Sequence, residues 1–304
     1  MDKVCFVVLH YKDEKATSDC INSLIDNILR EDVHIIVVDN GSGDGSGEFI
    51  KKSFEAFDNI HTIINKDNIG YAKGNNIGYC YAKEELQANY IVILNNDTLI
   101  KQSFFVEKII QLYNEKQFYI MGPDILSLSR SLHQSPLRDK PLSSKELREY
   151  LKVWDDFENK IIRNRLKYLM KGVIGKKTLL LYRKFKNSRS MNDSDFLYKY
   201  EQENVVLHGA CVVFSPLYVS REKEAFFSET FLYFEEDILT YLCNKKNMKI
   251  IYSPIVQVLH YEDQSTNKVV KKEFAKELFK IKHQRHSAKV FLNLMGLSPG
   301  EKGN

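Results

Sequence analysis

The first 125 residues alternate short runs of β-branched residues with segments of helical periodicity. Each run is apolar on both faces, which is typical of strands buried in a parallel sheet. Between the first two runs, Ile21, Leu24, Ile25 and Ile28 lie at helical spacing and predict an amphipathic helix. This order predicts an α/β fold with a Rossmann-like, mostly parallel central sheet flanked by helices. The predicted strands are residues 3–10, 33–40, 59–65, 90–97 and 118–125, followed later by 205–215, 249–254 and 255–260.

Hydrogen-bonding side chains end four of the predicted strands. The carboxyl ends of parallel strands meet at one edge of the sheet, and ligands of open α/β sheets bind at that edge. A purely structural sheet needs only caps and turns there, so the repeated polar ends predict a site of nucleotide size. The residues are His10, Tyr11, Asp39, Asn40, Asn65, Asn95, Asn96 and Asp97.

The glycine-rich stretch DNGSGDGSGEF, residues 39–49, differs from the known phosphate-binding loops. A dinucleotide fingerprint needs G-x-G-x-x-G after the first strand, whereas the four glycines here alternate strictly after the second. A P-loop is excluded because no G-K-[ST] follows. We interpret the glycines as a mobile turn that leaves the Asp39 carboxylate free for a base imide or a ribose hydroxyl.

Two further segments supply candidate nucleotide and metal contacts. NKDNIGYAKGNNIGY, residues 65–79, offers Asn68, Gly70 and Asn75, which are small or amide residues that allow close approach to a base or ribose. ILNNDT places Asp97 after a buried strand. One carboxylate there can hold Mg²⁺ or Mn²⁺, with the remaining ligands supplied by water and a diphosphate.

Six motifs in this order resemble the inverting glycosyltransferases of family 2, which have the GT-A fold. They are VVDNGSGDGS, NIGYAKGNNIGY, ILNNDT, HGACVVFS, FLYFEEDI and VLHYEDQST, within residues 3–125 and 204–266. The resemblance implies that Asp39 contacts the nucleoside. Asn95 replaces the first acid of the family's common Asp-x-Asp motif, so metal binding rests mainly on Asp97. Members similar to rhamnosyl and galactofuranosyl transferases show such departures, which makes dTDP-rhamnose or a UDP-sugar the expected donor.

The resemblance places the reaction at the acid-rich FEED segment. The family's Glu-Asp pattern makes Glu236 the catalytic base, with Glu235 and Asp237 beside it. Inverting transfer needs a base that removes the proton of the acceptor hydroxyl while an oxocarbenium-like carbon is attacked. The alternative is that these acids only cap a helix. His260 matches the family's histidine near the metal or the diphosphate, and His208 is expected either near a sugar or in the core.

The segment from Lys160 to Arg189 contains eleven Lys or Arg residues and no acid. Such a segment attracts anionic lipid, nucleic acid or polyphosphate. We expect it to hold the protein against an anionic membrane surface. We expect no nucleic-acid partner, because the segment contains no recognisable binding module.

The domain prediction follows the motifs. We expect a GT-A domain over residues 1–266 and a C-terminal amphipathic helix with a tail over 267–304. Within the GT-A domain, residues 1–125 form the nucleotide-sugar half, 126–203 a helical basic insertion, and 204–266 the half that carries the acceptor site and the base. No apolar run is long enough to span a bilayer, and no signal peptide is recognisable. We therefore expect a cytoplasmic protein, peripheral at the inner face of the cell membrane.

The predicted function is that of an inverting glycosyltransferase. It moves a sugar from a UDP or dTDP donor to a saccharide or a polyprenyl-diphosphate-linked acceptor, in bacterial capsule, O-antigen or cell-wall polysaccharide synthesis. The alternatives are an NAD-dependent dehydrogenase, weakened by the glycine spacing, and a basic nucleic-acid-binding protein. The five cysteines lack C-x-x-C spacing and are expected as buried thiols. The aromatic residues of YLKVWDDF and FFSETFLYF are more typical of a core than of a sugar-stacking platform, with Trp154 and Tyr233 as the alternative candidates for stacking on a sugar ring.

Overall fold

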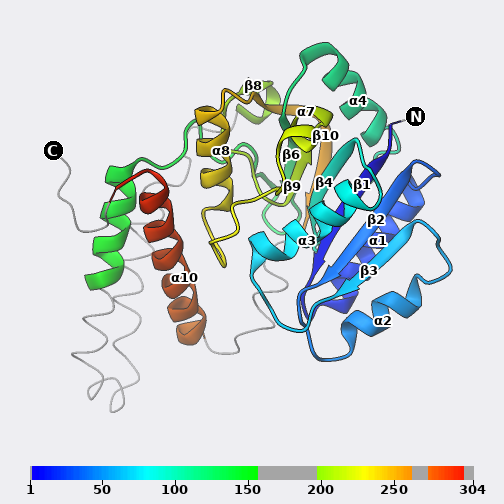
Figure 1. Ribbon diagram of the computed structural model, residues 1–304, viewed down its shortest axis with the longest axis horizontal. Coiled ribbons are helices and arrows are strands. Elements are labelled where there is room, and N and C mark those ends of the chain that lie inside the picture. The colour runs from blue at the N-terminus through cyan, green and yellow to red at the C-terminus, as the bar shows by residue number, and fades with distance from the viewer. Residues whose placement is uncertain (1, 157–196, 262–272, 298–304) are drawn as a thin grey trace. The chain divides into compact units, whose positions relative to one another are not determined.

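The computed structural model describes residues 2–156, 197–261 and 273–297 (Figure 1). The chain divides into two compact units, one of Met1–Pro141 with Leu197–Val269 and one of Leu142–Phe196 with Val270–Asn304. The basic segment 160–189 lies outside the described residues, so its predicted contact with a membrane stays a prediction.

The first unit is built on one ten-stranded sheet, whose main path has the order β3-β2-β1-β4-β9-β6-β10-β5. Its first four strands are parallel, as the sequence predicts. They are joined by helices on both sides of the sheet (Figure 1). The strands are β1 (Val4–His10), β2 (Val33–Asp39), β3 (Ile60–Ile64) and β4 (Tyr90–Asn95), and the helices are α1 (Glu14–Asn27), α2 (Ser46–Ser53) and α3 (Tyr71–Glu84).

The second half of the sheet is mixed. Its central strand is antiparallel to both neighbours, whereas the next two strands are parallel to each other. The elements are β9 (Cys211–Phe214), β6 (Ile120–Ser127), β10 (Ile250–His260), β5 (Thr98–Leu99), β7 (Leu132–His133) and β8 (Gln202–Glu203), with helices α4 (Phe105–Lys116), α7 (Pro216–Arg221) and α8 (Glu235–Lys245).

Two predictions about these strands are corrected. The expected strand 205–215 is shortened to Cys211–Phe214, because the chain turns at residues 208–210 before it enters the sheet. The two strands expected at 249–254 and 255–260 form the single strand β10, whose register against β6 shifts between Tyr252 and Gln257. Pro254 lies within that shift, where a missing backbone N–H is tolerated.

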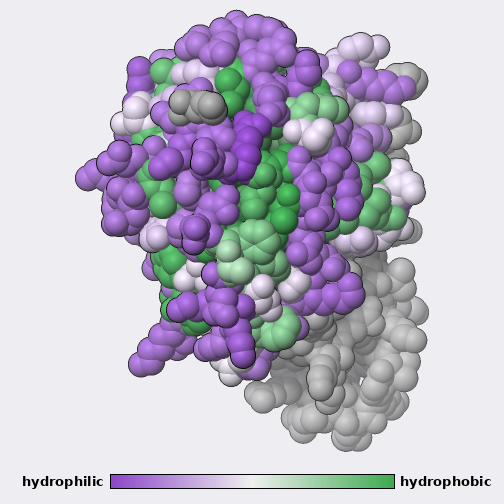
Figure 2. All heavy atoms as spheres, turned by 90° about the vertical axis from the view of Figure 1, so that its right-hand side faces the viewer, coloured by the Kyte–Doolittle hydropathy of each residue, from purple (hydrophilic) through white to green (hydrophobic). Residues whose placement is uncertain are grey.

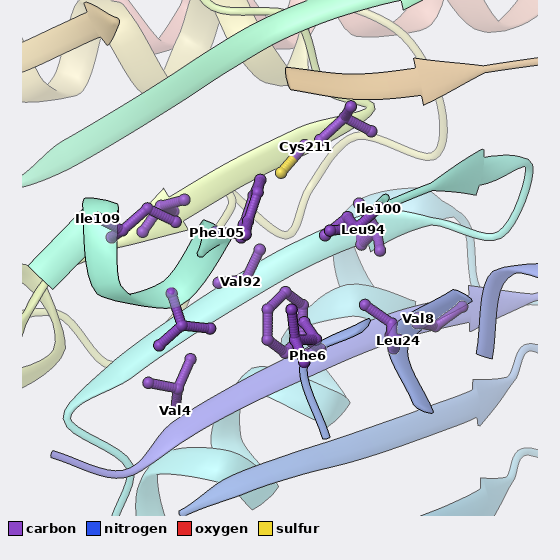
Figure 3. Packing of buried hydrophobic residues seen from close by; sticks show 14 of the residues in the cluster. Val4, Phe6, Val8, Leu24, Val92, Leu94, Ile100, Phe105, Ile109 and Cys211 are labelled. Atoms are coloured by element: carbon purple, nitrogen blue, oxygen red, sulfur yellow. The ribbon is translucent and has the colours of Figure 1, made fainter. Parts of the chain in front are cut away.

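Alternate residues of β1 enter two separate hydrophobic cores. Val4, Phe6 and Val8 join the core that contains residues of α1 and α4, as Figure 3 shows. Cys5 and Val7 join the core that contains residues of α3, α7 and α8. Because strand side chains alternate between faces, the apolar run at the N-terminus is buried on both sides and fixes the strand ends that carry polar residues.

The second unit is described over a helical stretch at 144–156 and α10 (Glu273–Leu294). Trp154 is buried and stacks on Tyr150 with ring centroids 5.4 Å apart, which is the core role expected for the aromatic residues of this segment. Arg285 Nη2 contacts Asp155 Oδ1 at 2.8 Å. Ile281, Ala288, Phe291 and Leu292 are buried in α10.

None of the helices in the described ranges is both long and apolar enough to cross a lipid bilayer. On the face shown in Figure 2, hydrophobic residues gather in a central area bordered by hydrophilic ones. All five cysteines are free thiols, of which four are buried and Cys80 is half-buried.

Candidate functional site

The register of the parallel strands brings the predicted polar ends to one edge of the sheet. His10 lies opposite Asp39, Asp39 lies opposite Ile64, and Leu9 lies opposite Asn95. The site therefore begins with the carboxyl ends of β1, β2, β3 and β4, as expected from the chain order.

The glycine turn after β2 is closely packed at two of its four glycines, Gly41 and Gly47. The backbone N–H and the hydroxyl of Ser42 donate to Asp39 Oδ1 at 3.0 and 2.5 Å. A Cβ on Gly41 would clash with the main chain at Asn68, and one on Gly47 would clash with Asp39 Oδ2. Gly41 and Gly47 therefore permit close approach of packed segments, whereas the exposed Gly43 and Gly45 have no atom within 4 Å of an added Cβ. Asp39 Oδ2 makes no hydrogen bond to any residue that the structure describes.

His10 supports this turn from inside the protein. Its Nδ1 lies 2.7 Å from Thr17 Oγ1, and its Nε2 lies 2.8 Å from Ser46 Oγ. The ring is fully buried and both nitrogens are engaged, so the prediction of a direct nucleotide contact by His10 is corrected. Tyr11 is half-buried, and the Lys12 ammonium group lies 5.2 Å from the centroid of the Tyr11 ring.

Asn40 connects the end of β2 to the start of α3. Its Nδ2 donates to Asn68 Oδ1 and to Gly70 O, both at 3.1 Å, and its Oδ1 accepts from the Ile69 N–H at 3.2 Å. Asn68 Oδ1 also accepts from the Gly70 N–H at 3.0 Å. The amide groups of Asn40 are therefore used within the protein, and this buried residue holds the predicted contact segment in place.

Two amide side chains near this edge have a buried atom without a hydrogen-bond partner in the described parts of the chain. They are Asn65, at Nδ2, and Asn75, at Oδ1. Asn75 uses its other amide atom to donate to Tyr71 O at 3.1 Å. Since buried polar atoms are normally satisfied, these two atoms are available to water or a ligand.

Asp97 and His260 meet where β5 pairs with β10. Thr98 lies opposite His260, and the Tyr261 N–H donates to Asp97 O at 2.9 Å. His260 Nε2 lies 3.3 Å from Asp97 Oδ1, and its Nδ1 lies 2.8 Å from Gln134 Oε1. With Nδ1–H donating to Gln134, the Nε2 atom is directed at the carboxylate, which is the orientation that metal-binding histidines need.

The two asparagines before Asp97 make contacts within the protein, Asn96 through its side chain and Asn95 through its main chain. Asn96 Nδ2 donates to Thr17 Oγ1 at 2.9 Å. The Asn95 N–H donates to Ala210 O at 2.9 Å, and Asn95 O accepts from Thr98 Oγ1 at 2.6 Å. Across the described residues, no three His, Cys, Asp or Glu side chains form a cluster that could hold a metal ion.

His208 lies edge-on to His260, with ring centroids 5.5 Å apart. Burial and the neighbouring His260 lower the pKa of His208 to about 3. The Ala210 N–H donates to its Nδ1 at 3.1 Å, so the neutral ring carries its proton on Nε2. His208 is thus a neutral hydrogen-bond donor beside the Asp97–His260 pair.

The three acids of FEED form the first turn of α8. The two preceding residues, Tyr233 and Phe234, have φ values of 77° and 71°, a left-handed conformation that is rare for such side chains. The positive end of the helix dipole favours carboxylates at this position. Strained backbone before a helix start is consistent with a site whose side chains must point in a set direction.

The three acids differ in their environments. Glu235 is buried, its Oε1 has no partner among the described residues, and burial together with Glu236 raises the pKa of Glu235 to about 8. Asp237 is buried and paired with Arg138, so this acid is a structural support and not a free base. Burial raises the pKa of Glu236, and Arg138 partly opposes the rise.

Glu236 rests on the turn before β9. A Cβ on Gly209 would lie 2.5 Å from Glu236 Oε1. Since Ala210 follows Gly209 and accepts from Asn95, this contact brings the acid turn to the end of β4. A small cavity of about 10 Å³ lies beside Glu236 and is also lined by Ile120, Leu207, Val212, Leu239, Thr240 and Ile250.

Sequence reasoning missed four residues that organise the site. Gly209 and Tyr71 lie inside quoted motifs, so position within a motif could have identified them. Arg138 and Gln134 lie in the segment after β6, where no periodic pattern or motif distinguishes them.

Comparisons with known proteins agree with this architecture. A family model described as glycosyl transferase family 2 matches residues 5–188. Glycosyltransferase GlyA of Streptococcus pneumoniae serotype 4 is 30% identical over 103 residues, which are 34% of this chain and 14% of that protein. The low-salt glycan biosynthesis hexosyltransferase Agl10 of Haloferax volcanii is 28% identical over 127 residues, 42% of this chain and 38% of that protein. The matches thus span less than two fifths of these relatives.

Two solved structures share the fold over 96% of the chain. TarS 1-349 of S. aureus has a TM-score of 0.53 at 12% identity, and the match covers 73% of that chain. The mannosyltransferase PcManGT from Pyrobaculum calidifontis, in complex with GDP-Man and Mn²⁺, has a TM-score of 0.54 at 12% identity and is covered over 70%. These likenesses confirm the predicted α/β fold of GT-A type.

Proposed function

Because the chain belongs to glycosyl transferase family 2, we propose that it moves a sugar, with inversion, from a nucleoside-diphosphate donor to an acceptor hydroxyl. The observation that carries the proposal is the turn at residues 208–210. On one side, His208 of this turn lies beside the Asp97–His260 pair, and on the other Gly209 contacts Glu236. A metal-and-diphosphate site and a buried carboxyl group thus share one turn, which is the arrangement that displacement of a diphosphate requires.

The donor in this proposal carries a pyrimidine base. Asp39 Oδ1 is occupied by two donors from Ser42, which leaves Oδ2 as an acceptor. One acceptor oxygen suits the single imide N–H of uracil or thymine, whereas guanine presents two adjacent donors that call for both carboxylate oxygens. This supports UDP or dTDP donors, including dTDP-rhamnose, over GDP donors.

Asp97 and His260 fit a divalent cation such as Mg²⁺ or Mn²⁺. A carboxylate oxygen and an imidazole nitrogen face each other there, and Gln134 fixes the imidazole orientation. When bound, the ion would offset the charge that develops on the leaving diphosphate. With two protein ligands, the remaining coordination positions would be filled by water and diphosphate oxygens.

Glu236 is the base in this proposal because its two neighbours, Glu235 and Asp237, are poorly suited to accept a proton. Glu235, with a pKa of about 8, is mostly protonated at neutral pH, and Asp237 is held by Arg138. Glu236 is left to accept the proton of the acceptor hydroxyl as the new glycosidic bond forms and the diphosphate leaves. Its raised pKa makes it a stronger base than an exposed glutamate.

The acceptor is a saccharide or a polyprenyl-diphosphate-linked sugar of surface polysaccharide synthesis. This part of the proposal rests on the basic segment 160–189, whose charge suits a diphosphate headgroup and an anionic membrane surface. It implies a cytoplasmic protein that is peripheral at the inner face of the membrane.

A calorimetric and thermal-shift screen of UDP-, dTDP- and GDP-sugars, with and without Mn²⁺, tests the function. We expect a UDP- or dTDP-sugar to bind with micromolar affinity and Mn²⁺ to strengthen the binding. Tight binding of NAD with no binding of any nucleoside diphosphate would contradict the proposal and favour the dehydrogenase.

A further inference from the structure

Tyr71 connects α3 to the two loops that surround the acids of α8. Its phenol O–H donates to Gly209 O at 2.9 Å, and its backbone N–H donates to Phe231 O at 2.8 Å. The residue before it packs on the same loop, since a Cβ on Gly70 would lie 2.5 Å from Phe231 O. The first turn of α3 is therefore fixed both to the turn under Glu236 and to the loop that leads into α8.

The Gly209 main chain determines where the Glu236 carboxyl group lies. A Cβ on Gly209 would lie 2.5 Å from Glu236 Oε1, so the carboxyl group rests directly on this main chain. Protein interiors are close-packed, and a shift of the Gly209 backbone changes the space available to the carboxyl group. The phenol of Tyr71 holds that backbone through its carbonyl oxygen.

We propose that Tyr71 is a positioning residue for the catalytic base: its phenol holds the Gly209 main chain where Glu236 can take the acceptor proton. This inference rests on the proposed function, because it requires Glu236 to be the base. Tyr71 immediately follows Gly70 and lies three positions after Asn68, and both are predicted nucleoside contacts. One segment thus serves the donor and the base, although the acid lies on a distant part of the chain.

A second buried tyrosine on α3 supplies a matched control. The Tyr79 O–H donates to Glu222 O at 3.3 Å, which is also a long-range bond from a phenol to a backbone carbonyl. Its surroundings are Phe214 and Tyr218 in the core. Removal of either hydroxyl takes one donor from a backbone carbonyl, and Glu222 O keeps a second donor in the Lys83 ammonium group at 2.8 Å. Only Tyr71 adjoins the acid turn.

The test compares Tyr71→Phe and Tyr79→Phe in the full chain. UDP with Mn²⁺ is the binding probe, and release of the nucleoside diphosphate from the donor selected by the screen measures kcat between pH 4 and 9. For Tyr71→Phe we expect kcat to fall about tenfold, with UDP affinity and donor KM within about twofold of the unchanged protein. We also expect the acid limb of kcat to move to lower pH, since a displaced, more exposed carboxyl group has a lower pKa.

Tyr79→Phe should change neither kcat nor the pH profile. If the two variants had the same kcat and the same pH profile, the inference would be overturned. A hydroxyl that only stabilises the fold would not shift the pH profile of kcat in Tyr71→Phe alone. Gly209→Ala gives an independent test, since the added Cβ displaces the Glu236 carboxyl group and leaves the phenol in place. It should reproduce the loss of kcat and the pH shift, and an unchanged profile would also overturn the inference.

The two levels of proposal fail differently. If Glu236→Gln retains full transfer, the assignment of the base fails, and the role of Tyr71 fails with it. If Glu236→Gln is inactive while Tyr71→Phe and Gly209→Ala behave like the unchanged protein, only the role of Tyr71 is refuted.

Discussion

The turn after β2 and the first turn of α8 both carry predicted site residues, but these turns differ in how far their polar side chains are hydrogen-bonded within the protein. After β2, His10 and Asn40 direct their polar atoms to other parts of the protein, and Asp39 uses one oxygen in the same way. In α8, Glu235 has an oxygen without a partner in the described structure, and burial raises the pKa of Glu236.

The difference separates two tasks within one site. Satisfied side chains hold a rigid surface against which a nucleoside can bind without further ordering. Desolvated carboxyl groups are costly to keep and are suited to proton transfer near neutral pH. The comparison predicts that changes in the α8 turn affect the reaction or the stability, whereas changes in the β2 turn affect donor affinity.

Glu236→Gln is the strongest test of this division. The amide keeps the shape of the side chain but cannot accept a proton, so we expect kcat to fall by about 10²–10⁴. The affinity for UDP with Mn²⁺, measured by calorimetry, should stay within about twofold. Glu107→Gln, at an acid on α4 paired with Arg30, serves as the control and should leave both quantities unchanged. Normal transfer by Glu236→Gln would show that the base lies elsewhere.

The cost of burying Glu235 should appear in the pH dependence of stability. Its pKa is about 8 in the folded protein and about 4.5 in the unfolded chain, so the folded state binds more protons between these values. The contribution of protonated Glu235 to the free energy of unfolding is therefore fully present below about pH 4.5 and is lost as the pH rises toward 8. Glu235→Gln removes this loss, and urea unfolding at pH 8 should show a gain of about 2–4 kcal/mol over the unchanged protein.

At pH 4.5 the same substitution should have little effect, because Glu235 is then protonated in the folded state. A gain of equal size at both pH values would contradict the titration of Glu235 as the cause.

Asp237 is the acid of the α8 turn that is paired with Arg138, which allows it to be compared with Glu235 and Glu236. Arg138→Met removes this cation from the buried carboxylate, and we expect a loss of about 2–3 kcal/mol of unfolding free energy. Lys116→Met is the matched control. The side chains of Arg138 and Lys116 are both 40% exposed, but their acids differ, with Asp237 at 3% and Glu201 at 29%. Breaking the exposed pair should cost less than about 1 kcal/mol, and equal losses would contradict the role of burial.

The sequence predicted the parts of this site that depend on local patterns. The polar strand ends followed from apolar runs of strand length, and Asp97 and His260 were both expected near a metal. The contacts that decide what each residue does are long-range. Arg138 and Asp237 are separated by 99 positions, Gln134 and His260 by 126, and Tyr71 and Gly209 by 138.

No periodicity connects such pairs, because the fold alone brings them together. The same reason applies to Gly41 and Gly47 in the glycine turn. Alternating glycines indicate conformational freedom, but the close packing against Asp39 and Asn68 that uses this freedom exists only in the assembled sheet.

The smallest expected effect belongs to the rigid turn after β2. In Asp39→Asn the side-chain oxygen can still accept from Ser42, while the amide nitrogen replaces Oδ2 and places a donor where the imide N–H of the base is proposed to bind. We expect UDP affinity to fall about tenfold, which corresponds to the loss of one hydrogen bond to a charged group. The kcat at saturating donor should stay within about twofold, because Glu236 is untouched.

Asp44→Asn is the control for Asp39→Asn, since Asp44 is also in the turn but accepts from the Ser46 N–H at 3.1 Å at the start of α2. It should leave UDP affinity unchanged. If Asp39→Asn lowered kcat and spared affinity, the two turns would not divide binding from chemistry. If both variants weakened UDP equally, the order of the whole turn, and not one carboxylate oxygen, would determine recognition of the base.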